Sequence, residues 1–169
     1  MHTALYLQAL HPEHTFCFLP VGQRIKSYGK DFSPVRTALE QADLILFSYP
    51  VYTFIAPYQL HRLIELIKQD GVDLRGKFAS QITTSKHFYD VTAHKYVEEN
   101  CFALGMKVVR GLSADMEDIL CEKGQCEAEC FLNSSFSPAR MNCSLPLPRK
   151  RLPGKICLSA GVAVGRKEP

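Results

Sequence analysis

The first 130 residues contain apolar positions at two spacings, one typical of helices and the other of strands. In several segments the apolar residues recur every three or four positions, which predicts amphipathic helices with one buried side. Proline or glycine near the ends of these segments marks where the helices begin and stop. The predicted helices cover residues 3–11, 34–41, 56–68, 89–104 and 122–131. In the helix at 89–104 the residues expected to face inward are Val91, Tyr96, Val97 and Phe102.

Short apolar or alternating runs separate these helices and predict strands. Leu44–Phe47 is wholly apolar, as expected of a parallel strand that is buried on both faces. The predicted strands cover residues 14–21, 44–47, 77–83 and 106–110. Helices and strands that alternate with short loops predict an α/β fold, in which a parallel sheet is covered by helices on both faces.

After Phe131 the periodic pattern stops, and five of the ten prolines fall in the remaining stretch. We therefore predict a domain over residues 1–131 and a poorly ordered tail over 132–169 that is rich in proline and basic residues. One exception is Lys155–Val164, an apolar run with strand character. The length of the chain is that of a single domain.

Charge is distributed unevenly between these two parts. The whole chain has a net charge of +3, but residues 131–169 hold seven basic residues and one acid, a net of +6, which leaves 1–130 at −3. The mildly acidic compact part argues against a nucleic-acid-binding surface there. The basic run Arg149–Arg151 could contact an anionic partner, although a solvated tail explains it as well.

Neither a membrane span nor a metal site is expected from the sequence. No run approaches the roughly 18 apolar residues of a transmembrane helix, and no signal peptide is recognisable, so the interpretation is a cytoplasmic protein without a membrane partner. Seven cysteines, an odd number, favour free thiols. Cys121, Cys126 and Cys130 are spaced unlike a zinc knuckle or an iron–sulfur motif.

Two loops follow predicted strands and therefore lie where parallel sheets bind ligands, at the carboxyl ends of the strands. The first, Ser48–Ile55, combines a hydroxyl, a proline corner and aromatic rings, which suit a planar ligand with polar edges. The second, Thr83–Tyr89, is rich in hydrogen-bond donors, and its Lys86 or His87 could lie near the polar edge of such a ligand. An ordinary strand-to-helix turn and a polar surface loop are the alternatives.

The residues Ala42-Asp43-Leu44-Ile45-Leu46-Phe47-Ser48-Tyr49-Pro50-Val51-Tyr52, followed by Ala56-Pro57-Tyr58-Gln59-Leu60, resemble the flavodoxin-fold NAD(P)H-dependent FMN oxidoreductases. The resemblance covers roughly residues 3–130 and implies a three-layer sandwich, FMN as cofactor, and NAD(P)H as electron donor. It also implies a quinone, flavin or protein as acceptor, and two subunits that pair across the flavin site. The cofactor-binding residues that it implies are Ser48, Pro50, Val51, Tyr52 and Thr53 at one edge of the flavin, and Thr83, Thr84 and Ser85 at the other.

No side chain has to act as a catalytic acid or base in this chemistry, since the flavin carries it. Tyr52 and His87 are the only candidates for proton donors. An electron-carrier flavodoxin is a further alternative, disfavoured because the compact part is only mildly acidic and the flavin loops lack tryptophan.

The sequence departs from the family at its start. The family opens with a strand and a Gly/Ser-rich loop that binds the FMN phosphate at a helix N-terminus. Here Met1-His2-Thr3 lies inside or just before the helix that follows this loop in the family, so the first strand and the phosphate loop are missing or replaced. Losing three or four charge-assisted bonds, each about 1.5–3 kcal/mol, predicts weak FMN binding. The alternative function is a truncated, non-catalytic remnant that binds a protein and no cofactor.

In the family's strand order, 2-1-3-4-5, the missing strand would leave a gap in the middle of the sheet. Unpaired backbone groups there would be too costly for a compact domain. Lys155–Val164 is the only spare segment with strand character, so we hypothesise that it fills the gap, as in a circular permutation. The alternative is that this run is disordered and that the domain is unstable or borrows a strand.

Overall fold

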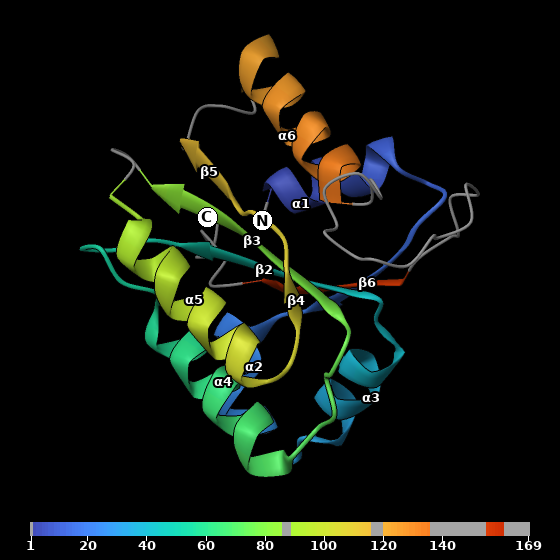
Figure 1. The fold of residues 1–169 in the computed structure, drawn as a ribbon, viewed down its shortest axis with the longest axis vertical. Coiled ribbons are helices and arrows are strands. Elements are labelled where there is room, and N and C mark those ends of the chain that lie inside the picture. Colours follow the sequence, from blue (N-terminus) through green and yellow to red (C-terminus); the bar gives the residue numbers. More distant parts are fainter. Residues whose placement is uncertain (1, 86–88, 116–119, 136–154, 161–169) are drawn as a thin grey trace, which may run out of the picture.

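The computed structural model describes residues 2–85, 89–115, 120–135 and 155–160. Helices and strands alternate through most of the chain (Figure 1). In chain order the elements are His2–Leu10 (α1), Thr15–Leu19 (β1), Val21–Tyr28 (α2), Ser33–Gln41 (α3), Leu44–Pro50 (β2), Tyr58–Asp70 (α4), Phe78–Ser85 (β3), Val91–Ala103 (α5), Lys107–Val108 (β4), Leu112–Asp115 (β5), Glu122–Ser135 (α6) and Lys155–Ala160 (β6).

The strands form one parallel sheet in the order β1-β6-β2-β3-β4. Strand β4 pairs with the first part of β3, and β5 pairs with the last part of the same strand. The last strand of the chain therefore lies in the interior of the sheet. Cys157 of β6 is paired with Cys17 of β1 on one side and with Ile45 of β2 on the other. The hypothesis that the C-terminal run fills the gap is confirmed for Lys155–Ala160, while residues 161–164 lie outside the described residues.

Helices cover both faces of the sheet, as predicted. Figure 1 shows α1 and α6 on one face and α2, α3, α4 and α5 on the other. Alternate residues of β2 enter the two cores, because successive side chains of a strand point to opposite faces. Ile45 and Phe47 belong to the larger core beneath α2–α5, and Leu44 and Leu46 belong to the smaller core beneath α1 and α6.

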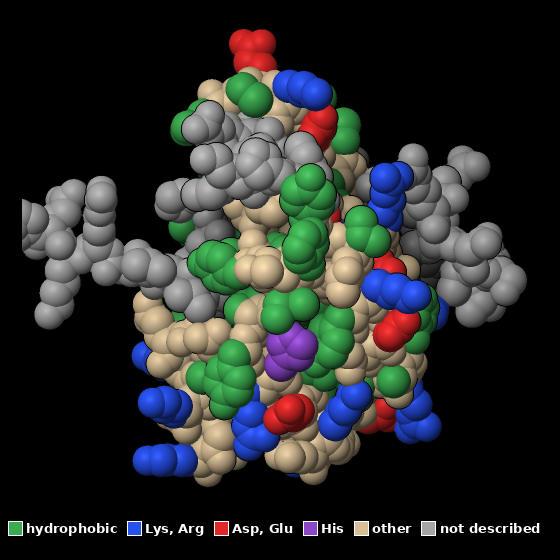
Figure 2. All heavy atoms as spheres, turned by 90° about the vertical axis from the view of Figure 1, so that its left-hand side faces the viewer, with side chains coloured by type: hydrophobic (Ala, Val, Ile, Leu, Met, Phe, Trp, Pro, Cys, Tyr) green, Lys and Arg blue, Asp and Glu red, His purple; other side chains and the backbone are tan. Residues whose placement is uncertain are grey.

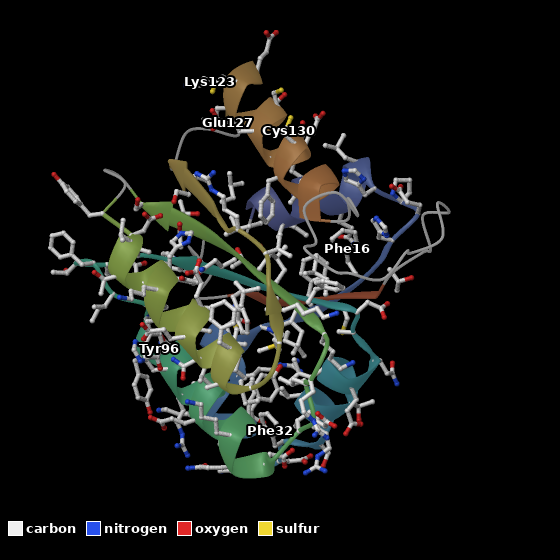
Figure 3. The ribbon with its side chains drawn as sticks, in the orientation of Figure 1. Phe16, Phe32, Tyr96, Lys123, Glu127 and Cys130 are labelled. Carbon is white, nitrogen blue, oxygen red and sulfur yellow. The ribbon has the colours of Figure 1, made fainter. Side chains whose placement is uncertain are left out.

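Two partly buried aromatic residues mark these cores in Figure 3. Phe16 packs against the smaller core and Phe32 against the larger one. Burial on both faces explains why Leu44–Phe47 of β2 is apolar without interruption. Its residues from Leu44 to Tyr49 are all buried.

Two segments differ from their predicted secondary structure. Helix α2 was not predicted, although its buried residues Val21, Ile25 and Tyr28 follow helical spacing directly after Pro20. The predicted strand at 106–110 is confirmed only for Lys107–Val108 (β4), and the strand at Leu112–Asp115 (β5) was not predicted. Both segments are short, and periodicity over so few residues is a weak signal because one or two positions decide it.

The buried side of α5 also differs from the prediction. Val91 and Phe102 are exposed, while Val97 is buried and Tyr96 partly buried as predicted. The buried stripe runs through Ala93, Val97 and Cys101, which are four residues apart and lie along one side of the helix. At about 100° per residue, Val91 and Phe102 point away from that stripe. The prediction of the buried side was wrong for Val91 and Phe102 because the helix buries smaller residues, Ala93 and Cys101, beside Val97.

The predicted boundary at residue 131 falls inside α6, which continues to Ser135. Within the predicted tail, Lys155–Ala160 is a strand of the sheet, and residues 136–154 and 161–169 lie outside the described residues. Among the described helices, none combines the length and the apolar character required to cross a membrane.

Candidate functional site

The two predicted ligand loops lie side by side at the carboxyl ends of adjacent parallel strands. Tyr49 of β2 is paired with Thr83 of β3, and Pro50 with Thr84. The pairing continues into the first loop, where the Val51 amide donates a hydrogen bond to the Thr84 carbonyl over 3.0 Å. The expected juxtaposition of the two loops is therefore confirmed.

The loop after β2 contains a tight turn with an uncommon backbone. Thr53 and Phe54 have φ angles of 51° and 72°, in the left-handed region that favours glycine. Tyr52 and Ile55 form an antiparallel bridge around them, and the Ile55 amide donates to the Tyr52 carbonyl over 3.3 Å. Positive φ at both central residues is the signature of a type I′ turn, which normally contains Asn-Gly. A branched and an aromatic residue here store strain, which clusters at ligand sites.

This turn carries apolar side chains that are more than half exposed. Tyr52, Phe54 and Ile55 are exposed on the loop after β2, and Tyr89 is exposed beyond β3. The rings of Phe54 and Tyr89 meet edge to face, with centroids 5.4 Å apart, and so link the two loops. Figure 2, which faces the left-hand side of Figure 1, shows hydrophobic side chains gathered on this side of the molecule. Exposed rings on a strained turn form a surface on which a planar ligand could pack.

The loop after β3 is anchored by a buried polar network. The Thr83 hydroxyl donates to the Asp90 carboxylate over 2.5 Å and lies 2.8 Å from Nε2 of His94. That nitrogen is also 3.3 Å from the Asp90 carboxylate and 3.4 Å from the Ser113 hydroxyl. The network joins β3, the first turn of α5 and β5. It therefore ties both ends of the 83–90 segment to the rest of the sheet.

Burial alone would raise the pKa of Asp90, but hydrogen bonds from Thr83 and Ser113, together with the nearby His94, hold that pKa below its ordinary value. Asp90 is thus a buried carboxylate that is ionised at neutral pH and fully engaged by its neighbours. A buried charge is tolerated only when it is hydrogen-bonded in this way. Its placement indicates that it positions the loop.

A second buried polar pair lies next to this network. The Tyr49 hydroxyl donates to the Gln81 side-chain carbonyl over 2.6 Å, and the Gln81 amide donates to the His94 carbonyl over 3.1 Å. Burial raises the pKa of Tyr49, so its hydroxyl stays protonated. A Cβ at Gly111 would lie 2.8 Å from Cε1 of His94 and 2.5 Å from Cγ of Gln81, so only glycine fits there.

The predicted site residues divide into three groups by exposure. Tyr52 and Thr53 are exposed. Pro50, Val51 and Thr84 are half-buried, and so remain partly open to a ligand. Buried positions are occupied by Ser48, Thr83 and Ser85. Thr83 is engaged by Asp90 and His94, so it supports the loop from within. Lys86 and His87 lie outside the described residues.

Sequence reasoning missed Phe54 and the polar network. Asp90 and His94 are four residues apart at the start of a helix, a spacing that places them on the same side. That spacing could have indicated a paired carboxylate and imidazole. The partners Thr83 and Ser113 come from two strands, and no local pattern brings them together with the helix. The unusual turn at Thr53-Phe54 has no sequence signal either, because both residues are atypical of it.

Comparison with known proteins finds no matching family model and no matching curated protein. Solved structures do match. An NADPH-quinone reductase from P. pentosaceus is 12% identical with a TM-score of 0.53, over 72% of this chain and 97% of that one. General stress protein 14 from Treponema denticola, solved in complex with FMN, is 13% identical with a TM-score of 0.50, over 65% of this chain and 76% of that one.

The chain has a flavodoxin-like fold. In the usual order of that fold, 2-1-3-4-5, β6 occupies the position of the first strand and β1 that of the second. The strand at the first position is thus supplied from the other end of the chain. The two loops described above follow the third and fourth positions, on the side where flavodoxin-like sheets bind their ligands.

Proposed function

We propose that this protein is an FMN-dependent redox protein. In this proposal it takes hydride from NAD(P)H and passes electrons to a quinone, another flavin or a protein. The observation that carries the proposal is the turn at Thr53-Phe54, strained and flanked by exposed rings, beside the loop after β3. A flavodoxin-like fold and a structural neighbour solved with FMN support it.

The described residues fit the ring system of a flavin. Pro50, Tyr52 and Phe54 offer apolar surface for packing. Thr53 and Thr84 offer hydroxyl and backbone groups for the polar edges of the ring. When bound, FMN would supply the hydride and electron transfer itself. The protein's part would be to orient the ring and to keep the loop after β3 in place through Asp90.

The phosphate part of FMN has no partner that the described residues identify. In flavodoxin-like folds the loop after the first strand position binds this group at a helix N-terminus. Here the residues after β6 begin at Gly161 and lie outside the described range. Our prediction is that the ring provides most of the affinity and that FMN binding is micromolar or weaker.

Quenching of flavin fluorescence on titration of the purified protein tests the proposal. We expect FMN and riboflavin to bind with affinities within about tenfold of each other, a difference of about 1.4 kcal/mol, because recognition rests on the ring. Tyr52→Ala should weaken both by about tenfold, since the loss of a stacked ring costs roughly that much. Absence of binding by either flavin would refute the proposal, and nanomolar binding of FMN alone would show a phosphate site.

Phe102→Ala is the matched control for Tyr52→Ala. Phe102 is also an exposed aromatic residue, but it lies near the end of α5, away from the loops at the helix start. We expect flavin binding to be unchanged in this variant. If a flavin binds, anaerobic mixing with NADH or NADPH should bleach its visible absorbance, and the faster donor is the preferred one.

A second candidate function is a flavodoxin-like module that binds another protein and no cofactor. The observation that favours it is the same group of exposed apolar side chains around Tyr52 and Phe54, because apolar patches also mark protein interfaces. The flavin titration separates the two candidates. A protein that binds neither riboflavin nor FMN, yet is stably folded, would favour the module.

A further inference from the structure

The turn between α1 and β1 brings together two imidazoles and a carboxylate. Its sequence is His11-Pro12-Glu13-His14, and it precedes β1, so it lies at the amino ends of the strands, opposite to the candidate functional site. The His11 amide donates to the Leu7 carbonyl over 3.1 Å, and the His14 amide donates to the His11 carbonyl over 3.1 Å. These backbone bonds close the turn and hold the three side chains near one another.

The three side chains are spaced as ligands of one small ion would be. Nδ1 of His11 lies 3.1 Å from Oε1 of Glu13, and Nε2 of His14 lies 3.9 Å from the same oxygen. All three ligand atoms lie within 4.8 Å of one another. Ligands at about 2.1 Å from a tetrahedral zinc ion are about 3.4 Å apart. Small side-chain rotations would therefore bring the group to this geometry.

We propose that His11, Glu13 and His14 bind a divalent metal ion of the zinc type, with water completing its coordination. Two imidazoles and one carboxylate form a donor set that suits zinc and neighbouring first-row ions. Calcium and magnesium prefer all-oxygen sites, so they fit poorly. Among the described residues, this is the only group of three such side chains within that distance.

Exposure of the three groups agrees with such a site. The side chains of His11 and His14 are only 13% and 5% exposed, whereas that of Glu13 is 43% exposed. The imidazoles are thus largely fixed by packing, and the carboxylate side remains open to an ion and its water.

A bound ion would connect α1 to β1. His11 directly follows α1 and His14 directly precedes β1, so one ion would fix the angle at which the chain enters the sheet. An ion that binds only the folded state raises stability according to its concentration relative to Kd. The metal site would thus act on the fold, independently of any flavin at the opposite edge.

Titration of untagged, chelator-treated, reduced protein with Co²⁺ is the direct test. A site made of nitrogen and oxygen ligands should give a visible d–d absorption band and no near-ultraviolet thiolate-to-cobalt band. This distinction is needed because the chain has seven cysteines, including Cys126 and Cys130 on the same helix. Zn²⁺ should displace the Co²⁺ band and raise the thermal unfolding temperature.

The variants His11→Gln, Glu13→Gln and His14→Gln should each weaken Co²⁺ binding by more than about tenfold, since even changes outside the ligand set cost that much in metal affinity. The matched control is His61→Gln, because His61 lies on α4 and its ring contacts that of Tyr96 in a tilted arrangement with centroids 4.2 Å apart (Figure 3 labels Tyr96). Binding in this control should equal that of the wild type.

Three results would overturn the proposal: no visible band up to millimolar Co²⁺, a thiolate band in place of the d–d band, or wild-type affinity in the His11 and His14 variants. Circular dichroism of each variant without metal shows whether it is folded. The cobalt spectrum of the wild-type protein shows by itself whether the ligands are nitrogen and oxygen or thiolate. The proposal can therefore be tested even if a variant does not fold.

Discussion

The loops after β2 and β3 lie side by side, yet they are built in opposite ways. The loop after β2 exposes Tyr52 and Phe54 and contains two residues with positive φ. At the loop after β3, Thr83 and Asp90 are buried and satisfied by His94 and Ser113. An exposed, strained apolar turn contributes little to folding, whereas a buried, satisfied network specifies one arrangement. The contrast agrees with the proposed function, in which one loop contacts a ligand and the other is held in place to support it.

The two strands that carry these loops also differ in their neighbours. Strand β2 is paired with β3 on one side and with the C-terminal strand β6 on the other. Strand β3 is paired with β2, β4 and β5. The loop after β2 therefore depends on a segment from the far end of the chain, while the loop after β3 depends on strands close to it in sequence.

Removal of the C-terminal strand should have the largest effect. Deleting residues 150–169 leaves β2 and β1 with unpaired backbone groups in the interior of the sheet. We expect the loss of several kcal/mol of unfolding free energy, enough to unfold a marginal domain. Thermal unfolding followed by circular dichroism measures it.

Deletion of residues 165–169 alone is the control, and it should cost less stability than the longer deletion because it leaves β6 in place. The milder variant Cys157→Pro removes one backbone donor between β1 and β2. In that variant the amides of β2 should lose protection from hydrogen exchange before those of β3. Unchanged stability of the 150–169 deletion would contradict the interior position of β6.

Replacement of the buried carboxylate in the second loop should have an intermediate effect. Asp90→Asn removes a charge that accepts bonds from Thr83 and Ser113. We expect a loss of about 2 kcal/mol at neutral pH, as for other buried bonds to charged groups. Because the folded-state pKa of Asp90 is lowered, this contribution is present above the ordinary aspartate value of about 3.9 and is lost as pH falls through the folded-state pKa.

Denaturant titrations of the wild type and of Asp90→Asn at several pH values measure this contribution. The difference between the two proteins should be largest near neutral pH and should shrink in acid. Glu99→Gln is the control, since Glu99 pairs with Lys95 in an exposed ion pair on the same helix and its loss should have no measurable effect. A difference independent of pH would mean that the charge of Asp90 is not what stabilises the loop.

Replacement of the strained turn should have the smallest effect, and in the opposite direction. The double variant Thr53→Asn/Phe54→Gly supplies the residues that a type I′ turn prefers. We expect a gain of about 1 kcal/mol, because the relief of left-handed strain exceeds the loss of the Phe54–Tyr89 contact. If the turn serves flavin binding, the same variant should bind riboflavin more weakly.

Urea unfolding together with the riboflavin titration checks both parts of this prediction. Tyr58→Ser is the comparison, because Tyr58 is exposed but lies in α4 and has no positive φ. It should not be stabilised. A double variant that is less stable than the wild type would show that the turn at Thr53-Phe54 is not strained.

The sequence by itself determined the elements whose signal is local. The apolar run Leu44–Phe47 is a strand buried on both faces, and helical spacing located α1, α3, α4, α5 and α6. The positions of Pro50 to Thr53 and of Thr83 to Ser85 at the ends of neighbouring strands followed from the alternation of elements. These features depend on residues within a few positions of one another, so periodicity and loop length were sufficient to predict them.

The tertiary structure alone decided which distant residues meet. The C-terminal run was recognisable from the sequence as a strand, but only the sheet order in the structure establishes that it pairs with β1 and β2. The contacts of Thr83 with Asp90 and His94, the exposure of Val91 and Phe102, and the turn at Thr53-Phe54 have no reliable local signal. The physical reason is that packing selects among contacts that local preferences leave nearly equal, and it can stabilise a conformation that those preferences disfavour.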